Sequence, residues 1–314
     1  MNCQIHFAPI QGVTDRLYRN LHKKYFGGVD FYYTPFIRVE HGNEFRTKDL
    51  RDISLENEQV KNLIPQILGG DVEEMKMMLN MLREQGFHEV NINLGCPFPM
   101  IVRKGKGAGI LAYPEKVEPL LEMIQDFPML RCSVKMRLGW KDVEEGFMLL
   151  PLLNRSSLSS IIVHARLGVD GYKGEVDHRA FQHFYERCEL PLLYNGDLCS
   201  IDEVQQVCVR YPRLAGVMVG RGLLADPALA LACKQGTDLD DVMKKKLFRL
   251  FHDELVESNA ERLEGDHQLL MRMKTFWEYF MPGVDQKLLK KIRKTNRWFV
   301  YKEIVNEIFR FDEK

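Results

Sequence analysis

Over most of its length the chain alternates short apolar runs with longer stretches whose apolar residues recur at helical spacing. The predicted strands are residues 5–8, 30–34, 64–69, 89–93, 133–137, 160–164, 192–195 and 216–219. Continuous apolar runs of this length are typical of parallel strands that are buried on both faces. Between them lie helical patterns at residues 72–84, 114–125 and 201–209, with Pro114 and Ser200 at two helix starts. This alternation predicts an α/β fold, a TIM-type (β/α)8 barrel.

The strand pattern ends after Pro227, and the rest of the chain is helical in period. Interruptions near Gly265 and at Pro282 divide residues 237–314 into several amphipathic helices. At 314 residues the chain is longer than a typical single domain. We therefore predict two domains, a catalytic barrel in residues 1–236 and a small all-helical domain in residues 237–314.

Composition argues against several classes of protein. The formal net charge is zero, so an anionic partner must be bound by a local basic patch rather than by the whole surface. The seven cysteines form no CxxC pair and no regular framework, which argues against structural zinc and disulfides and predicts a cytoplasmic location. An apparent strand follows Met1 almost at once, leaving no room for a signal peptide, and no apolar run reaches membrane-spanning length. We expect a soluble protein without a metal site.

Polar residues and glycines gather at the C-terminal ends of the predicted strands, where a barrel keeps its active site. In chain order they are Pro9 to Gly12, Gln66, Asn93 with Cys96, Lys135 with Arg137, His164 with Arg166, Asn195 to Asp197, and Gly220 to Gly222. Taken singly, each has a structural explanation, such as a buried amide for Gln66 or a core histidine for His164. Seven strand ends of one barrel rarely all carry hydrogen-bonding groups by chance, so together they predict one polar site.

Cys96 comes directly after the apolar strand at residues 89–93 and stands before a proline. A thiol at the end of a parallel strand is a nucleophile, a proton donor or a residue without a function. The segment that follows, residues 100–111, is rich in glycine and in basic residues. This composition predicts a mobile lid that carries the cysteine.

Glycines follow the last two predicted strands, in the sequences Asn195-Gly-Asp and Val219-Gly-Arg-Gly. This end of a barrel is the usual phosphate site, because glycine lets backbone N–H groups approach a phosphate and an arginine can add a charged hydrogen bond. A tight turn could also require the first of these glycines. With an amide (Gln66) and a lysine (Lys135), the site suits flavin mononucleotide (FMN), whose anionic reduced form a cation would stabilise. No dinucleotide-binding glycine motif follows a strand, which argues against a bound dinucleotide.

Taken in order, these motifs resemble the tRNA-dihydrouridine synthase family. They are Ala8-Pro-Ile with Gly12, Gln66, Asn-Leu-Gly-Cys-Pro, Lys-Met-Arg, Val-His-Ala-Arg, Asn-Gly-Asp and Val-Gly-Arg-Gly, and the resemblance extends over essentially the whole chain. Phe36-Ile-Arg-Val and Leu269-Leu-Met-Arg-Met-Lys make the chain most similar to the dihydrouridine synthase C type. That resemblance implies reduction of the uridine at position sixteen of the tRNA D-loop.

The resemblance implies an FMN enzyme that converts a tRNA uridine to 5,6-dihydrouridine. Reduced FMN would give hydride to C6 of the uracil, and Cys96 would give a proton to C5 as a general acid. NADPH would bind transiently as the reductant, and the base would have to swing out of the folded tRNA into the barrel mouth. The chain departs from the family pattern at Leu167, where a threonine is common.

The same resemblance assigns roles to individual residues. The uracil edge would be held by Asn93, Arg137 and Tyr172. The residues that would contact FMN are Ala8, Pro9, Ile10, Gln66, Lys135, His164, Asn195, Gly196, Asp197, Gly220 and Arg221. The residues that would position the tRNA are Arg38, Arg272, Lys274 and Arg293.

A basic stretch near the C-terminus is the predicted RNA-binding surface. Residues 286–302 contain seven cations and no acidic residue. Three aromatic residues lie in this stretch: Trp298, Phe299 and Tyr301. They could stack on unpaired bases or form the buried stripe of a helix. We expect the aromatics to belong to the core and the cations to neutralise phosphates, which would make binding salt-sensitive. Cations after Cys96 that could also meet the RNA backbone are Arg103, Lys104 and Lys106.

Two other functions remain open from the sequence. An FMN barrel that acts on a small molecule, such as a dihydroorotate-dehydrogenase-like enzyme, would share the phosphate end but would not explain the basic helical tail. A non-catalytic tRNA-binding protein would be expected to lack the thiol or the flavin lysine, and both are present. The sequence implies no protein partner.

Overall fold

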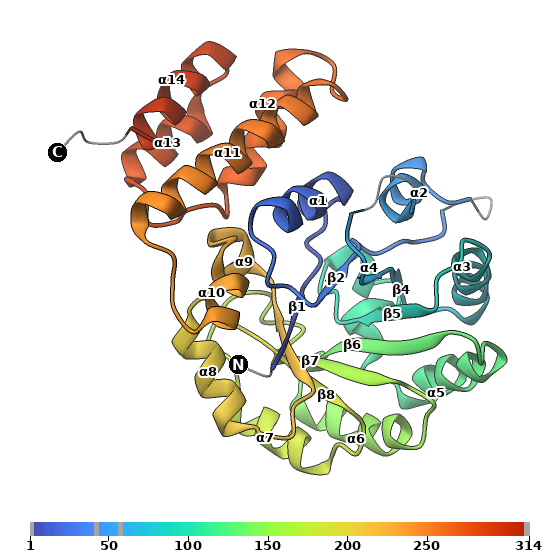
Figure 1. Cartoon of the computed structure of the whole chain (residues 1–314). Coiled ribbons are helices and arrows are strands. Elements are labelled where there is room, and N and C mark those ends of the chain that lie inside the picture. Colours follow the sequence, from blue (N-terminus) through green and yellow to red (C-terminus); the bar gives the residue numbers. More distant parts are fainter. Residues whose placement is uncertain (1–2, 41–43, 56–58, 311–314) are drawn as a thin grey trace.

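Nine short strands form one parallel sheet that curves around a central core (Figure 1). The computed structural model describes residues 3–40, 44–55 and 59–310. The strands are β1 (Gln4–Phe7), β2 (Phe31–Tyr33), β3 (Leu63–Ile64), β4 (Gln66–Leu68), β5 (Glu89–Leu94), β6 (Arg131–Gly139), β7 (Ser160–Leu167), β8 (Leu192–Asn195) and β9 (Gly216–Val219). Their order is β3-β2-β1-β9-β8-β7-β6-β5-β4, so the first strand pairs with the last, as in a barrel.

The barrel closes at Pro65, which separates β3 from β4. β3 pairs with β2 and β4 pairs with β5, so the two pieces occupy the place of one strand. Proline has no N–H to donate to a ladder, but its carbonyl accepts the Asn91 N–H at 2.9 Å, and Ile37 pairs with β4 in place of β2. The predicted barrel is confirmed, and the single strand expected at residues 64–69 is corrected to two short strands.

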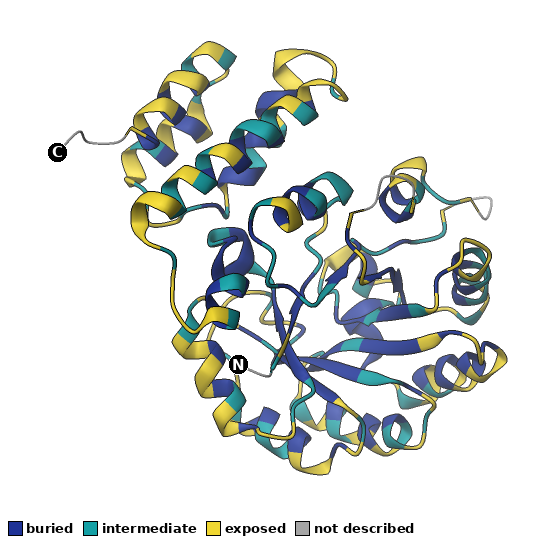
Figure 2. Cartoon of the chain, viewed as in Figure 1, coloured by how far each residue is buried: buried dark blue, intermediate teal, exposed yellow. Residues whose placement is uncertain are grey.

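Helices cover the outside of the barrel (Figure 1). They are α1 (Arg16–Tyr25), α2 (Thr47–Ile53), α3 (Val72–Glu84), α4 (Pro99–Val102), α5 (Pro114–Met123), α6 (Val143–Asn154), α7 (His178–Arg187), α8 (Ile201–Arg210), α9 (Arg221–Ala225) and α10 (Leu229–Gln235), with 3-10 turns η1 (Gly107–Ile110) and η2 (Ile124–Asp126). Side chains of Asp71, Asp142, Asp177 and Ser200 accept a first-turn N–H and so cap four of them. Most of the buried residues are apolar. They lie along the strands and on parts of the surrounding helices (Figure 2). The loops after the strands therefore gather at one mouth of the barrel.

Between α10 and residue 310, the last residue that the structure describes, the chain forms four helices, in agreement with its helical period. They are α11 (Asp241–Ala260), α12 (Gly265–Trp277), α13 (Gln286–Lys294) and α14 (Trp298–Ile308). Phe251 of α11 is fully buried, and its ring meets those of Tyr18 and Phe26 of the barrel, each with 5.3 Å between ring centroids. The core of the helical region is therefore continuous with that of the barrel. Within the described ranges, no helix is both long and apolar enough to cross a bilayer.

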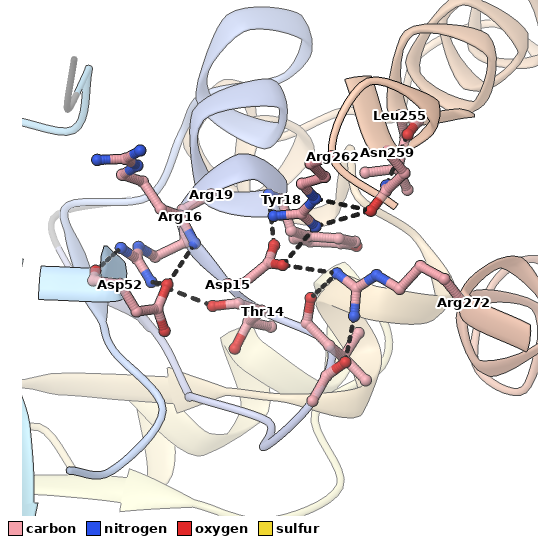
Figure 3. Close-up of polar contacts among 12 residues, drawn as sticks. Thr14, Asp15, Arg16, Tyr18, Arg19, Asp52, Leu255, Asn259, Arg262 and Arg272 are labelled. Carbon is pink, nitrogen blue, oxygen red and sulfur yellow. Dashed lines mark hydrogen bonds and ion pairs between the residues drawn. The ribbon is translucent and has the colours of Figure 1, made fainter. Parts of the chain in front are cut away.

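An ion-pair cluster ties the helical region to the loop between β1 and α1 (Figure 3). The Asp15 carboxylate caps α1 and pairs with Arg262 at 2.7 Å and with Arg272 at 3.1 Å. Arg272 also donates to the carbonyl oxygens of Gly12 and Val13, the latter at 3.0 Å. We call Asp15, Arg262 and Arg272 the Asp15 clamp. It joins α12 to the loop that leaves β1.

A second arginine holds the other side of the same loop. Arg19 donates to the Thr14 carbonyl at 3.2 Å and pairs with Asp52 of α2 at 3.2 Å (Figure 3). Burial raises the pKa of Asp52 to about 6, although Arg19 opposes the rise. The Thr14 hydroxyl in turn accepts the Ile10 N–H at 2.8 Å. Three consecutive carbonyls, those of residues 12–14, thus accept hydrogen bonds from guanidinium groups. These bonds, together with the Thr14 hydroxyl, fix the backbone of the loop from residue 10 onward.

Candidate active site

A cavity opens at the C-terminal ends of the strands. It brings together every residue to which the sequence gives a catalytic, flavin-binding or uracil-binding role: Ala8, Pro9, Ile10, Gln66, Asn93, Cys96, Lys135, Arg137, His164, Tyr172, Asn195, Gly196, Asp197, Gly220 and Arg221. Their shared location is a feature of the structure, whereas their individual roles stay predictions. No group of three or more histidine, cysteine or carboxylate side chains among the described residues could hold a metal ion.

A chain of amides on β4 and β5 supports one wall of the cavity. Asn93 Nδ2 donates to Gln66 Oε1 at 2.8 Å, and Gln66 Nε2 donates to Asn91 Oδ1 at 2.7 Å. Asn91 Nδ2 then donates to Ser133 Oγ on β6 at 2.9 Å. Each amide donates to the next, so the chain has one direction and fixes how the amides point. Gln66 and Asn93 each keep one N–H for a ligand.

The Cys96 loop is held in place by side chains of two strands. Asn93 Oδ1 accepts the N–H groups of Gly95 and Cys96 at 3.0 and 2.9 Å. Arg137 Nε donates to the Gly95 carbonyl at 3.0 Å, and its Nη1 donates to the Leu167 carbonyl at 2.8 Å. Two residues predicted to bind uracil, Asn93 and Arg137, are therefore also supports of the cysteine loop.

The surroundings of Cys96 keep its thiol protonated. Burial raises the pKa of the thiol, although the Phe98 N–H and the cations Arg137 and Lys135 oppose the rise. A thiol with a raised pKa is a poor nucleophile, since the reactive species is the thiolate. Of the alternatives that the sequence left open, this environment favours the proton donor.

The segment after Cys96 is folded into α4 and η1 and packs back on the cysteine. The Ala108 N–H donates to the Cys96 carbonyl at 3.0 Å, and Ala108 and Ile110 are fully buried. Gly107 has φ +57°, and a Cβ at this position would lie 2.7 Å from the Cys96 carbonyl oxygen. Gly107 is therefore required for close packing. The segment is folded against Cys96, whereas its glycine content had suggested a mobile lid.

Lys135 of β6 lines the cavity without a hydrogen-bond or ion-pair partner among the described residues. Burial and the neighbouring Arg137 lower its pKa to about 7, although Cys96 opposes the change. Lys135 is half-buried, and an amine withdrawn from water without a partner is costly to a fold. The position therefore fits a ligand that offers an anionic or carbonyl group to the amine.

His164 of β7 is neutral, and its hydrogen-bond partner determines which ring nitrogen carries the proton. Burial lowers the pKa of His164 well below its ordinary value, and four neighbouring cations lower it further. These cations are Lys135, Arg137, Arg166 and Arg221. Its Nε2 lies 3.2 Å from Arg166 Nη1, and a guanidinium can only donate. Nε2 is therefore the acceptor, and Nδ1 carries the proton.

We expect Lys135→Met to stabilise the ligand-free protein against heat. Burial lowers the pKa of Lys135 from its ordinary value of 10.5 to about 7, so between these values the unfolded chain binds more protons than the folded one. This lysine therefore makes the folded state less stable at pH 7 than at pH 10. The rise in unfolding midpoint should be largest near pH 7 and shrink toward pH 10. Thermal denaturation of flavin-stripped protein checks this, and exposed Lys141→Met is the control. An equal shift at both pH values would contradict the assignment.

Asp197 lies between two arginines at the end of β8. Arg166 donates to both of its carboxylate oxygens, and Arg221 Nη2 donates to Oδ1 at 2.6 Å. Burial opposes ionisation of the carboxyl, but the two guanidinium groups outweigh it and lower the pKa of Asp197. Asp197 has φ +43°, a strained backbone for a residue other than glycine. Its side chain therefore positions the two arginines.

Arg166 is a site residue to which the sequence reasoning gave no role. It is buried behind the cavity, and its Nη2 also donates to the Gly174 carbonyl at 2.7 Å. Arg166 stands two positions after His164 on the same strand, so both side chains lie on the same face. That alternation is the signal that could have found it.

The predicted phosphate site has free donors. Gly196, Gly220 and Arg221 line the cavity, and their backbone N–H groups donate no hydrogen bond within the described part of the chain. Asn195, by contrast, uses its side-chain N–H to join β8 to β9, at 2.7 Å from the Met218 carbonyl. Unpaired N–H groups beside an arginine fit a phosphate.

Comparison with known proteins agrees with this geometry. The model of one protein family, "Dihydrouridine synthase (Dus)", matches residues 6–310. The chain belongs to the dihydrouridine synthase family. The resemblance inferred from the motifs is thereby confirmed.

Relatives of this dihydrouridine synthase carry two different names. The tRNA-dihydrouridine synthase B of Pasteurella multocida is 26% identical over 241 residues, which cover 76% of this chain and 71% of that protein. The tRNA-dihydrouridine(16) synthase of Vibrio parahaemolyticus is 25% identical over 313 residues, which cover 94% of this chain and 92% of that protein. Among solved structures, morphinone reductase in complex with tetrahydroNAD aligns with a TM-score of 0.54 and 11% identity, over 77% of this chain and 90% of that chain. This last likeness shows the barrel fold alone.

The residues predicted to position RNA lie outside the cavity of this dihydrouridine synthase. Arg38 forms an ion pair at 3.1 Å with a glutamate two residues further on. Arg272 belongs to the Asp15 clamp, and Lys274 Nζ lies 3.4 Å from an asparagine oxygen in the loop after α13. Arg293 is exposed on α13. Contact of these residues with RNA stays a prediction, and for Arg272 the structure adds an internal role.

The basic stretch forms α13 and the first turns of α14. All seven cations are exposed, and they are Lys287, Lys290, Lys291, Arg293, Lys294, Arg297 and Lys302. Tyr301 is buried, and Trp298 stacks on it with 4.8 Å between ring centroids. Phe299, however, is 66% exposed. The expectation that the aromatics belong to the core is therefore wrong for Phe299.

Proposed function

We propose that this protein uses FMN and NADPH to reduce a D-loop uridine of tRNA to 5,6-dihydrouridine, in the cytoplasm. The observation that carries the proposal is the meeting, in one cavity, of a protonated thiol, an unpartnered lysine and unpaired backbone N–H groups. Exposed cations on α13 of the same chain support an RNA substrate rather than a small molecule.

The cavity fits FMN at both of its ends. The N–H groups of Gly196, Gly220 and Arg221 would hold the phosphate, with the Arg221 side chain adding a charged hydrogen bond. Lys135 and the Nδ1–H of His164 would meet the polar edge of the ring. Bound here, reduced FMN supplies the hydride that C6 of the uracil receives, and NADPH supplies the electrons for the next turnover.

Cys96 would donate the proton that completes the reduction. As C6 gains hydride, the C5=C6 double bond becomes a single bond, and C5 takes a proton from the thiol. The thiolate that remains would be stabilised by Arg137 and Lys135, which are the cations that already favour its charged form. Solvent then returns the proton to the sulfur.

Three residues would hold the uracil in place. Asn93 keeps one N–H free and Arg137 keeps its Nη2, and both are donors suited to the uracil carbonyls. Tyr172 is 55% exposed at the cavity, and its ring lies 5.5 Å from the Arg137 guanidinium carbon and 5.2 Å from that of Arg221. An exposed aromatic ring at this position could stack on a base that has been flipped out of the tRNA.

We assign the reaction to position sixteen of the D-loop. The support is the motif Leu269-Leu-Met-Arg-Met-Lys on α12, together with the relative that is named for this position and aligns over 94% of the chain. α12 contacts α13, which carries the exposed cations, and contributes Arg272 to the Asp15 clamp. It is thus placed to orient a bound tRNA relative to the cavity.

Mapping dihydrouridine in tRNA by mass spectrometry tests the proposal, together with an absorption spectrum of the purified protein. We expect a yellow protein, and we expect tRNA from cells without the gene to lack dihydrouridine at position sixteen alone. Loss at another D-loop position would keep the activity and correct the position. A colourless protein with unaltered tRNA would overturn the proposal.

A further inference from the structure

Two large apolar side chains stand exposed within four residues of Cys96. Phe98 is 54% exposed and Met100 is 61% exposed. Single exposed apolar residues are common on protein surfaces and need no explanation. Residues 95–97 line the cavity, so this pair lies on the same short segment as the reacting thiol, while Ile101 of that segment is buried. We treat Phe98 and Met100 as one exposed apolar patch.

The backbone presents Phe98 rigidly. Pro97 and Pro99 flank it, and each proline restricts the residue before it to extended conformations. Phe98 has φ −63° and ψ 127°, and its carbonyl accepts the Ile101 N–H at 2.9 Å. A residue whose backbone is restrained in this way loses little further backbone entropy when a ligand covers its side chain.

The charge around the patch is positive and unneutralised. Arg103 and Lys104 follow one helical turn after Met100, are exposed, and form no ion pair among the described residues. Lys106 differs, because it pairs with Glu74 of α3, and the prediction that it meets the RNA backbone is revised accordingly. No acidic residue occurs in residues 97–114. The patch is thus complementary to a polyanion with exposed apolar faces.

We propose that Phe98 stacks on the unpaired base next to the target uridine, with Met100 beside it and with Arg103 and Lys104 on the adjoining phosphates. This inference rests on the proposed function and names how the RNA is held at the site. When the target base leaves its stack, the neighbouring base exposes an aromatic face to water. A phenyl ring on the Cys96 segment would cover that face and so offset part of the cost of flipping.

The test compares variants of the flavin-loaded enzyme on an unmodified tRNA transcript at several salt concentrations. We expect Phe98→Ala to weaken tRNA affinity and kcat/KM at least about fivefold, with an unchanged salt dependence, since stacking releases no counterions. Phe98→Trp should restore both. Phe98→Leu should behave like alanine, because it keeps apolar area without an aromatic face. Arg103→Gln with Lys104→Gln should instead lower the salt slope by about 0.7 for each cation.

Controls separate this inference from the proposed function and from folding. Met129→Ala removes a side chain of similar exposure, 73%, before β6 at the opposite end of the barrel, and should change nothing. Flavin reduction by NADPH and the thermal midpoint should be unaltered in every variant. If the native enzyme forms dihydrouridine and Phe98→Ala equals it, the inference is overturned while the function stands. Native activity in Phe98→Leu would exclude stacking. Unchanged RNA affinity with lost self-association would assign the patch to a second copy of the chain.

Discussion

Replacing Cys96 with alanine is expected to lower dihydrouridine formation by about 10²- to 10⁴-fold, the usual loss when a general acid is removed. Binding of FMN and tRNA should persist, because the cysteine loop is held by Asn93 and Arg137 rather than by the thiol. Single-turnover assays with pre-reduced enzyme measure the step directly. Native turnover should also fall as pH rises through the pKa of Cys96, which burial raises above its ordinary value of 9.0.

The chain offers a matched control for this substitution. Cys199 also lines the cavity but lies at its phosphate end and is exposed. Cys199→Ala should leave turnover close to native, since this thiol is not among the groups expected to meet the uracil. If Cys96→Ala turned over at the native rate, or if both variants lost activity equally, the general-acid assignment would be wrong.

Reversing Lys290, Lys291 and Arg293 to glutamate is expected to weaken tRNA binding at least about a hundredfold at moderate salt. These cations are exposed on α13, and Lys291 has only a long, exposed ion pair, at 3.8 Å, to a glutamate of α14. Flavin content and reduction by NADPH should be unchanged, since α13 does not line the cavity. Filter binding at several salt concentrations, beside an absorption spectrum, measures both effects.

The control for this variant carries the same change of charge elsewhere. Arg83, Arg187 and Arg210 stand in the last turns of α3, α7 and α8, at the end of the barrel away from the cavity. Their reversal to glutamate alters the net charge equally and should leave tRNA affinity within a fewfold of native. Equal losses in the two triple variants would mean that overall charge, and not the α13 surface, governs binding.

Much of the fold followed from the sequence, and the exceptions have physical causes. Consecutive apolar positions locate buried parallel strands well, because both faces of such a strand are covered. Pro65 was included in a continuous strand, although a proline within an apolar run signals an interrupted ladder. Ile37, rather than β2, pairs with β4. This is a tertiary contact, so the local sequence carries no pattern that predicts it. Phe299 was placed in the core because an exposed aromatic carries no local signal.

The residues that line the site could be predicted from the sequence, but the hydrogen bonds and ion pairs between them could not. Glycines and polar residues at the strand ends predicted which positions line the cavity, because the barrel brings those ends together. Interactions between the side chains depend on distances that a sequence does not contain. The pairing of Arg166 with Asp197, and the use of Arg137 to hold the Gly95 carbonyl, are of this kind. The packing role of Gly107 was also hidden, because flexibility and close approach both favour glycine.

The Asp15 clamp also limits how this protein can be recombined with its relatives. A chimera that takes only the four C-terminal helices would move Arg262 and Arg272 away from Asp15 and from the carbonyls of Gly12 and Val13. On a barrel whose loop lacks a carboxylate at position 15, such a graft leaves both guanidinium groups without their charged partner at a partly buried junction, which destabilises the junction. A crossover that keeps the junction intact must carry residues 12–15 of the barrel along with the helices, so the exchangeable unit is discontinuous in the gene.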